Sequence, residues 1–275
     1  MRDLNKIVQK KIAMKWTEEA EKAIKKVPFF VRKKVRARVE DEAKSAYRKI
    51  VTISDVKTTQ KRYLTNMSSE IKGFQIDTCF GSGGCPNRAI ESNTLFNSLE
   101  NLFAKEDILK FLRQHIGNNI KFHHEFKVTL ADCPNACSRP QIKDIGIIGA
   151  SIPEITENEC TLCGQCVEIC KENAVTLNKN ECAPEINHDL CLKCKQCIKE
   201  CPTGTISEKK AGFRILLGGK LGRHPQLAEE LPGIFTEDET LKIAKKCIKH
   251  YKKNSKNGAR FADIYTGLNL GSTDY

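Results

Sequence analysis

The sequence predicts an α+β fold in which a mixed domain is interrupted by a cysteine-rich insertion and preceded by a helical module. Apolar residues recur at helical spacing within residues 1–50. A cysteine motif occurs twice within residues 151–210. Elsewhere, apolar residues at helical spacing predict helices at 94–116 and 236–253. Alternating apolar and polar residues predict strands at 74–77, 126–130 and 145–147.

The composition favours metal sites. The chain has 275 residues, of which 14 are cysteines. So many cysteines would indicate disulfides in a small secreted domain, but this chain is long and its cysteines are clustered. Residues 1–16 lack the pattern of a signal peptide, and no run of 18 apolar residues occurs. We therefore expect no membrane insertion and a cytoplasmic location, in an anaerobic cell because such thiolates suit oxygen-sensitive clusters.

Residues 1–72 are predicted to form the N-terminal helical module and its linker. Thr17 can cap a first helix, because Glu18 and Glu19 follow in the first turn, where the helix dipole favours acidic side chains. Pro28 interrupts this helix. A short strand is expected at Thr52–Val56, and the basic residues Lys57, Lys61 and Arg62 after it form a loop over the active site or are merely solvated. The second helix carries an apolar stripe made of Val31, Val35, Val39, Ala43 and Ala46.

The stretch Trp16–Ala43 resembles a small helical module of light-independent protochlorophyllide reductase subunits. One interpretation is a helical hairpin that only packs. The other is a module that covers a tetrapyrrole or docks a partner. The residues leave both open.

Two pairs of cysteines could form one four-thiolate site. Cys79 and Cys85 lie in the run DTCFGSGGCPNR, and Cys133 and Cys137 lie in CPNAC. Such a site could hold zinc or an iron–sulfur cluster, but the spacing fits poorly to a zinc finger. Three glycines of the first run let the backbone curl around a cluster and approach a flat cofactor; they are Gly81, Gly83 and Gly84.

The run CPNACSRPQIKDIG at 133–146 resembles the sulfite and nitrite reductases, in particular the dissimilatory and anaerobic sulfite reductases. The resemblance covers about residues 73–275. It implies a sirohaem-type domain built from residues 73–150 and 211–275, with a [4Fe–4S] cluster on Cys79, Cys85, Cys133 and Cys137. It also implies that Cys137 ligates the sirohaem iron. The run FRILLGGKLGRHP at 213–225 resembles the family's returning strand and Gly-rich turn, which makes Gly218 and Gly219 cofactor-binding candidates.

The insertion at 151–210 resembles a bacterial ferredoxin with two clusters. Its motif C-x2-C-x2-C-x3-C begins at Cys160 and again at Cys191, 31 residues later. In that pattern the fourth cysteine serves the other cluster. Lys171 stands where the family has proline, and Cys182 and Cys247 fit neither set. The resemblance implies one [4Fe–4S] cluster on Cys160, Cys163, Cys166 and Cys201, and a second on Cys191, Cys194, Cys197 and Cys170.

The net charge of +12 has three interpretations: a solvated Lys-rich surface, a nucleic-acid site, or counter-charge for bound cofactors. Three clusters at roughly −2 each, together with the carboxylates of sirohaem, favour the third interpretation. We expect no nucleic-acid partner, because no helix-turn-helix, RRM or finger pattern occurs.

Reduction of a sulfur oxyanion requires cations near the substrate and a supply of protons. Arginine and lysine suit sirohaem carboxylates as well as the substrate, so the sequence leaves these two roles open. His123 and His124 are either structural or deliver protons. The candidate catalytic cations are Arg88, Arg139, Lys143, Lys220 and Arg223.

The resemblance implies an oxidoreductase: a sirohaem-dependent sulfite reductase of anaerobic or dissimilatory type that converts sulfite to sulfide. Ferredoxin clusters would pass electrons to the sirohaem-coupled cluster. The alternatives are a nitrite reductase and a non-catalytic iron–sulfur electron-transfer subunit. The expected partners are sulfite or nitrite and a low-potential electron donor protein. Family enzymes combine two related halves, so a homo-oligomer or a paired subunit is also expected.

Overall fold

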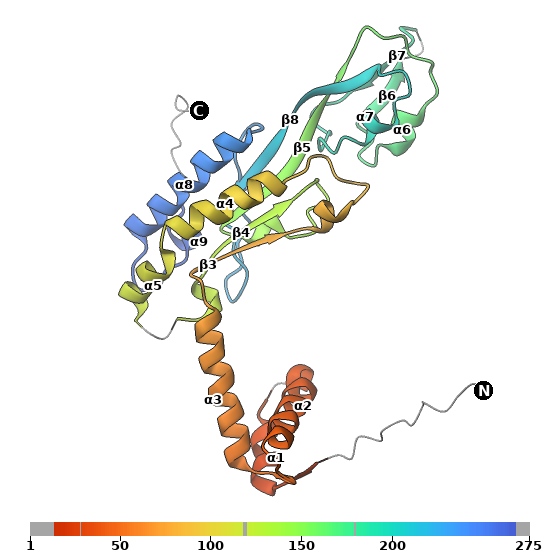
Figure 1. Ribbon diagram of the computed structural model, residues 1–275. Helices are drawn as coiled ribbons and strands as arrows, with labels where there is room; N and C mark the ends of the chain where they lie inside the picture. The colour runs from red at the N-terminus through yellow and green to blue at the C-terminus, as the bar shows by residue number, and fades with distance from the viewer. Residues whose placement is uncertain (1–13, 28, 118–119, 179, 268–275) are drawn as a thin grey trace, which may run out of the picture. The chain divides into compact units, whose positions relative to one another are not determined.

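Two units make up the chain, Met1–Glu70 and Ile71–Tyr275. They are seen in a computed structural model that describes residues 14–27, 29–117, 120–178 and 180–267 (Figure 1). Pro28, the expected helix interruption, lies outside the described residues. Among the described helices, none combines the length and apolar character needed to cross a membrane.

The described residues of the first unit form three helices beside a pair of two-residue strands. Thr17 caps α1 as predicted, because its side chain accepts a hydrogen bond from the Ala20 amide. The core contains Ala20, Val39, Ala43 and Val51. The elements are β1 (Lys15–Trp16), α1 (Glu18–Lys25), α2 (Phe29–Ser45), β2 (Ile50–Val51) and α3 (Ile53–Glu70), with β1 parallel to β2.

Three expectations for this unit were wrong. Thr52–Val56 is no strand and 57–62 is no loop, because α3 begins at Ile53 and runs to Glu70. The Asp55 carboxylate accepts hydrogen bonds from the Thr52 amide and hydroxyl at 2.8 Å each, which stabilises the helix start that the strand pattern concealed. Ala46 lies beyond the end of α2 and is exposed, so it does not belong to the apolar stripe.

The positive charge is concentrated in the first unit. Residues 1–70 contain 19 Lys and Arg against nine Asp and Glu, whereas residues 71–275 contain 27 against 25. The net charges are therefore +10 and +2. In the unit that carries every cysteine, cations and anions nearly balance before any cofactor binds.

A five-stranded sheet in the order β3-β4-β5-β8-β9 organises the second unit. The first three strands are parallel, and β8 runs antiparallel to both β5 and β9. Parallel strands require crossovers, and the one between β3 and β4 contains α4 and α5. The strands are β3 (Phe74–Thr78), β4 (Phe126–Ala131), β5 (Ile145–Ile155), β8 (Ile206–Leu217) and β9 (Glu229–Glu230).

Helices cover one face of this sheet (Figure 1). Alternate residues of β4, namely Phe126, Val128 and Leu130, are buried against them, as the strand pattern predicted. The helix α8 begins with the predicted capping box of Thr236 and Glu239. The helices are α4 (Asn93–Lys105), α5 (Ile108–Ile116), α8 (Glu237–Asn254) and α9 (Phe261–Ile264), with 3-10 turns at Phe80–Gly83, Phe122–His124 and Pro140–Ile142.

The single helix expected at 94–116 is two helices. The chain breaks at Asp107, whose φ of 45° lies in the left-handed region. Its carboxylate accepts a hydrogen bond from the Lys110 amide and so starts α5. The apolar residues continue across the break, which explains why periodicity alone did not reveal it.

The strands β5 and β8 extend past the rest of the sheet as a two-stranded arm (Figure 1). Their pairing ends at Ile155 and Ile206, so residues 156–205 form a separate group at the end of the arm, which we call the cysteine lobe. It contains α6 (Gln165–Ile169), β6 (Val175–Asn178), β7 (Ala183–Ile186) and α7 (Gln196–Glu200). The lobe thus lies within the larger unit, between two paired strands.

Truncation of the buried Leu99 tests the helix-covered core. Leu99 on α4 is fully buried, so we expect Leu99→Ala to lower the free energy of unfolding by about 2–5 kcal/mol. Leu227→Ala is the matched control, because this leucine is 74% exposed and should change stability by less than about 0.5 kcal/mol. Urea unfolding of both variants measures the difference, and equal losses would contradict the assignment of the core.

Candidate functional site

The first four cysteines meet where two parallel strands end. Cys79 directly follows β3, and Cys133 comes two residues after β4. Because β3 and β4 are adjacent and parallel, their carboxyl ends lie at one edge of the sheet. Burial raises the pKa of the Cys133 thiol, and the nearby thiols of Cys79, Cys137 and Cys85 raise it further. The structure therefore brings these four residues together.

Backbone amides point at the Cys79 sulfur. The amides of Gly81 and Asp132 each donate a hydrogen bond to Sγ at 3.3 Å. A Cβ at residue 81 would clash with the Asp132 side chain, so only glycine fits this position. Asp132 is buried, and its Oδ1 accepts a hydrogen bond from the Ser92 hydroxyl at 2.5 Å. Amide hydrogen bonds of this kind stabilise a thiolate, the form that binds iron.

The loop from Cys133 to Arg139 turns sharply and leaves Cys137 exposed. Ala136 and Arg139 have left-handed φ angles of 51° and 60°. The Arg139 amide donates to the Ala136 carbonyl at 2.8 Å, and the Ser138 hydroxyl donates to the Leu130 carbonyl at 2.7 Å. Cys133 is buried, whereas Cys137 faces outward. One thiol of the group is thus accessible to a ligand outside the site.

The cysteine lobe brings its eight repeat cysteines into two sets. One small cavity is lined by Cys160, Cys163, Cys166 and Cys201. In the other set, burial raises the pKa of Cys197 to about 12, and the thiols of Cys191, Cys194 and Cys170 add to the shift. The fourth cysteine of each repeat therefore lies with the other repeat, which is the arrangement that the ferredoxin resemblance implied.

The two repeats have matching backbone turns. Leu162 and Lys193 are left-handed, with φ of 54° and 64°, and their amides donate to the sulfurs of Cys160 and Cys191. Gly164 and Lys195 are also left-handed, and each precedes a short helix.

The turn after Cys170 keeps its shape although Lys171 replaces proline. Asn173, three residues after Cys170, is left-handed like Gly204, three residues after Cys201. The Ala174 amide donates to the Cys170 sulfur at 3.3 Å, and the Ile206 amide donates to Cys201 at the same distance. The substitution therefore leaves both sulfurs hydrogen-bonded by backbone amides.

These sets suit iron–sulfur clusters better than single ions. Within the described ranges, no group of three or more His, Cys, Asp or Glu side chains is close enough to hold one metal ion. A four-iron cluster separates its thiolates more widely than one tetrahedral zinc ion does. The wider spacing of these thiols is therefore consistent with iron–sulfur clusters.

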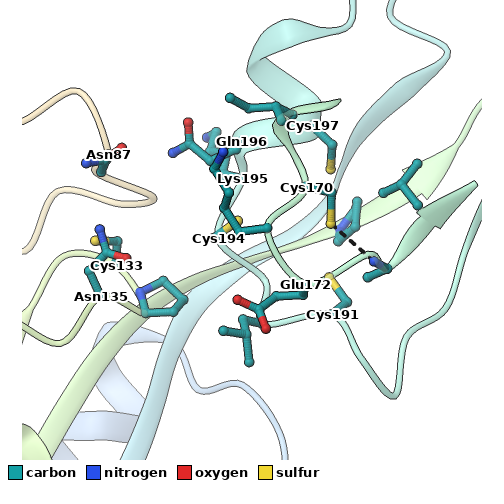
Figure 2. Close-up of a pocket in the computed structure, with 17 residues that line it drawn as sticks. Asn87, Cys133, Asn135, Cys170, Glu172, Cys191, Cys194, Lys195, Gln196 and Cys197 are labelled. Atoms are coloured by element: carbon teal, nitrogen blue, oxygen red, sulfur yellow. Dashed lines mark hydrogen bonds between the residues drawn. The ribbon is translucent and has the colours of Figure 1, made fainter. Parts of the chain in front are cut away.

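We call the group of Cys79, Cys85, Cys133 and Cys137 the first cysteine site, and the group of Cys170, Cys191, Cys194 and Cys197 the second-repeat site. A cavity of about 290 Å³ separates these two sites (Figure 2). Asn87, Cys133 and Asn135 line one side of it. The opposite side is formed by the lobe, and its lining includes Cys170, Cys191, Cys194, Lys195, Gln196 and Cys197. The set with Cys191, rather than the set with Cys160, thus faces the first site.

Three of the five candidate cations are already paired with carboxylates. Lys143 contacts Asp77 at 2.7 Å, Arg88 contacts Glu91 at 3.2 Å, and Lys220 pairs with Asp263. The other two, Arg139 and Arg223, are exposed, and the described part of the chain shows no ion pair for either.

The four candidate glycines other than Gly81 fall into two groups. Space is open around Gly83 and Gly84, where a flat cofactor could approach. Gly218 packs against the Tyr265 ring, and Gly219 packs against the carbonyl groups of Gln141 and Lys143. These last two glycines are therefore used for close packing within the protein.

A cationic group that the sequence analysis missed lies on the helix-free face of the sheet. Lys127 alternates with the buried residues of β4 and is half-buried. Burial lowers its pKa, and the nearby cations Arg260 and Lys143 lower it further. Arg260 contacts the fully buried Asp144 at 3.4 Å. The alternation of β4 could have shown which face Lys127 occupies, but Arg260 is distant in sequence and gave no signal.

The two histidines lie at the edge of this group. Their rings contact each other with centroids 4.1 Å apart. Burial lowers the pKa of His123, and Lys121, Lys127 and Arg260 lower it further. The His124 Nδ1 accepts a hydrogen bond from the Lys121 amide, which is a structural role. His123 is thus the histidine placed near the cations.

Comparison with known families gives two matches. The family described as "Nitrite and sulphite reductase 4Fe-4S domain" matches residues 72–268. The family described as "Proto-chlorophyllide reductase 57 kD subunit" matches residues 16–59. Both agree with the resemblances drawn from the motifs.

Curated relatives include the "Coenzyme F420-dependent sulfite reductase" of Methanocaldococcus jannaschii, 31% identical over 182 residues. That match covers 66% of this chain and 27% of the relative. A subunit of the anaerobic sulfite reductase of Salmonella typhimurium is 28% identical over 120 residues, which is 44% of this chain and 29% of the relative. The chain thus spans less than a third of the length of each.

Among solved structures, dissimilatory sulfite reductase I matches with a TM-score of 0.46 and 15% identity, covering 74% of this chain and 54% of that one. Because the nitrite and sulphite reductase match covers well over half of the sequence, the chain belongs to the family defined by the nitrite and sulphite reductase 4Fe-4S domain.

Proposed function

We propose that this chain is the sirohaem-binding subunit of an anaerobic sulfite reductase that converts sulfite to sulfide. The observation that carries the proposal is the first cysteine site. Its four cysteines converge at the ends of β3 and β4, and Cys137 is exposed while Cys133 is buried. One buried and two partly buried thiols beside one exposed thiol suit a cluster that is coupled to a second metal centre.

In this proposal the chain holds three [4Fe–4S] clusters and a sirohaem. Cys79, Cys85, Cys133 and Cys137 would bind the coupled cluster, and the two lobe sets would bind the others as in a ferredoxin. When bound, the clusters supply one-electron transfer and the haem iron supplies a ligand site for sulfur. The amide hydrogen bonds to the cysteine sulfurs would stabilise the reduced clusters and so set their potentials.

The helix-free face would bind the anions. Lys127 is half-buried and forms no ion pair with a carboxylate in the described part of the chain, whereas Lys143 and Arg260 each contact one. A desolvated cation attracts an oxyanion more strongly than an exposed one. We therefore assign Lys127 to sulfite, and the exposed Arg139 and Arg223 to sirohaem carboxylates. His123 is proposed to carry protons toward this face.

Sulfite is favoured over nitrite because the two curated relatives described above are named sulfite reductases. Since the chain spans under a third of each, further protein is proposed to complete the enzyme. This would be a second copy or a paired subunit, together with a low-potential electron donor in an anaerobic cytoplasm.

The decisive test is the cofactor content of protein purified without oxygen. We expect about 13 iron atoms per chain, from three four-iron clusters and one haem iron, together with a tetrapyrrole absorbance spectrum. Turnover of sulfite and nitrite with a reduced dye would then identify the substrate. About 12 iron atoms and no tetrapyrrole, even after co-expression with sirohaem synthesis, would contradict the enzyme and support an electron-transfer subunit.

Gly81→Ala tests the first site alone. The new methyl group would meet the Asp132 side chain and displace the amide that donates to Cys79. We expect this variant to lose about four iron atoms per chain while the lobe keeps its clusters. Gly83→Ala is the matched control, because nothing lies within 4 Å of the position where its Cβ would be placed. Equal iron content in both variants would count against the assignment.

Lys127→Gln tests the anion site. Loss of a charge-assisted hydrogen bond costs about 1.5–3 kcal/mol, so kcat/KM for sulfite should fall roughly 10- to 100-fold with the cofactors retained. Lys245→Gln is the control, because it removes an exposed lysine on α8, and it should change kcat/KM by less than about twofold. A variant at Lys127 with unchanged kcat/KM would exclude this lysine from substrate binding.

A further inference from the structure

One lysine joins the cysteine lobe to the first cysteine site. Lys199 lies on α7, between Cys197 and Cys201. Its Nζ donates hydrogen bonds to the carbonyls of Pro86 at 2.8 Å and Arg88 at 2.7 Å. These carbonyls belong to the turn that follows Cys85. A single side chain therefore links the helix that carries Cys197 to the loop that carries Cys85 of the first site.

A second set of contacts holds the lobe against the arm. The Ser151 amide on β5 donates to the Lys193 carbonyl at 2.8 Å, and the Ser151 hydroxyl donates to Glu208 at 2.5 Å. Glu208 also pairs with Lys195 at 2.7 Å. These contacts fix the second repeat to β5 and β8, but none of them reaches the turn after Cys85.

The position of the cavity shows why it matters that only the hydrogen bonds of Lys199, of the two sets of contacts described above, reach the turn after Cys85. Its two sides are the loops of the first site and of the second-repeat site, and Asn87 on one side lies between the two residues that Lys199 binds. The contacts at Ser151 hold only the lobe side. The hydrogen bonds of Lys199, in contrast, span from the lobe to the Cys85 turn.

We propose that Lys199 is a positioning residue that fixes the separation between the first cysteine site and the second-repeat site, and that its charge raises the reduction potentials of both. This inference rests on the proposed function, because it assumes that both sites hold clusters. The rate of electron transfer depends on that separation, so the hydrogen bonds of Lys199 would set how quickly the first cysteine site is re-reduced.

The chemistry of lysine accounts for both proposed effects, the fixed separation of the sites and the raised reduction potentials. An ammonium group has three donors, and two of them are used on backbone carbonyls. Reduction adds negative charge to a cluster, so a fixed cation nearby stabilises the reduced form and raises its potential. Removal of the cation should therefore lower the potential, independently of any change in position.

Three substitutions separate geometry from charge. Lys199→Met removes both the donors and the charge, Lys199→Gln keeps a donor without charge, and Lys199→Arg keeps the charge with a different shape. Lys209→Met is the matched control, because Lys209 is an exposed lysine on β8 outside the lobe. Iron content and circular dichroism establish that each variant is folded and loaded.

Two measurements on the anaerobic full-length protein test the proposal. Hydrogen–deuterium exchange of the amides at 87–89 should be at least tenfold faster in Lys199→Met than in wild type and unchanged in Lys209→Met. In an EPR-monitored redox titration, the equilibrium constant for one-electron reduction should fall severalfold in Lys199→Met and Lys199→Gln and stay near wild type in Lys199→Arg.

Exchange and potentials equal to those of the Lys209→Met control would overturn the proposal. Faster exchange with unchanged reduction potentials would refute the proposed effect of the Lys199 charge on the potentials. Lys199 would then only hold the turn after Cys85 in position. The exchange measurement needs no cluster signal, so a wild-type chain without clusters would refute the proposed function while exchange still decides whether Lys199 holds the turn.

Discussion

The site depends on one constraint, which is that β3 and β4 are adjacent and parallel. Parallel pairing places the ends of both strands at the same edge of the sheet, and a cysteine follows each end. Two cysteines 54 residues apart in the sequence, Cys79 and Cys133, are thereby brought together. Gly81 and Asp132 then close the loops around the Cys79 sulfur, since no larger residue fits at position 81. The core between the sheet and its helices holds both strands in place.

The arm formed by β5 and β8 extends this constraint to the lobe. It leaves the same sheet, so the lobe is attached through two paired strands rather than a flexible linker. Repeated left-handed turns shape each half of the lobe, and the fourth cysteines exchange between the halves. Within the described part of the chain, Lys199 donates hydrogen bonds from the lobe to the turn after Cys85, which gives this lysine its proposed importance.

Local motifs predicted much of this arrangement, whereas long-range contacts were out of reach. The cap at Thr17, the capping box at Thr236 and the alternation in β4 depend on near neighbours, and the structure shows all three. The helix α3 was missed because its sequence is polar and its start is stabilised by Asp55. Lys199 and Arg260 were missed because each contacts residues more than 100 positions away. Spacing cannot reveal such partners.

The most direct test of the central claim is an anomalous-difference map at the iron edge from crystals grown without oxygen. The account predicts three separate four-iron peaks in the second unit, together with one single-iron peak from the haem outside the three cysteine sets. One four-iron peak should lie among Cys79, Cys85, Cys133 and Cys137, with the second-repeat peak nearer to it than the first-repeat peak. A single-atom peak in the first site, or no iron there while both lobe peaks are present, would contradict the account.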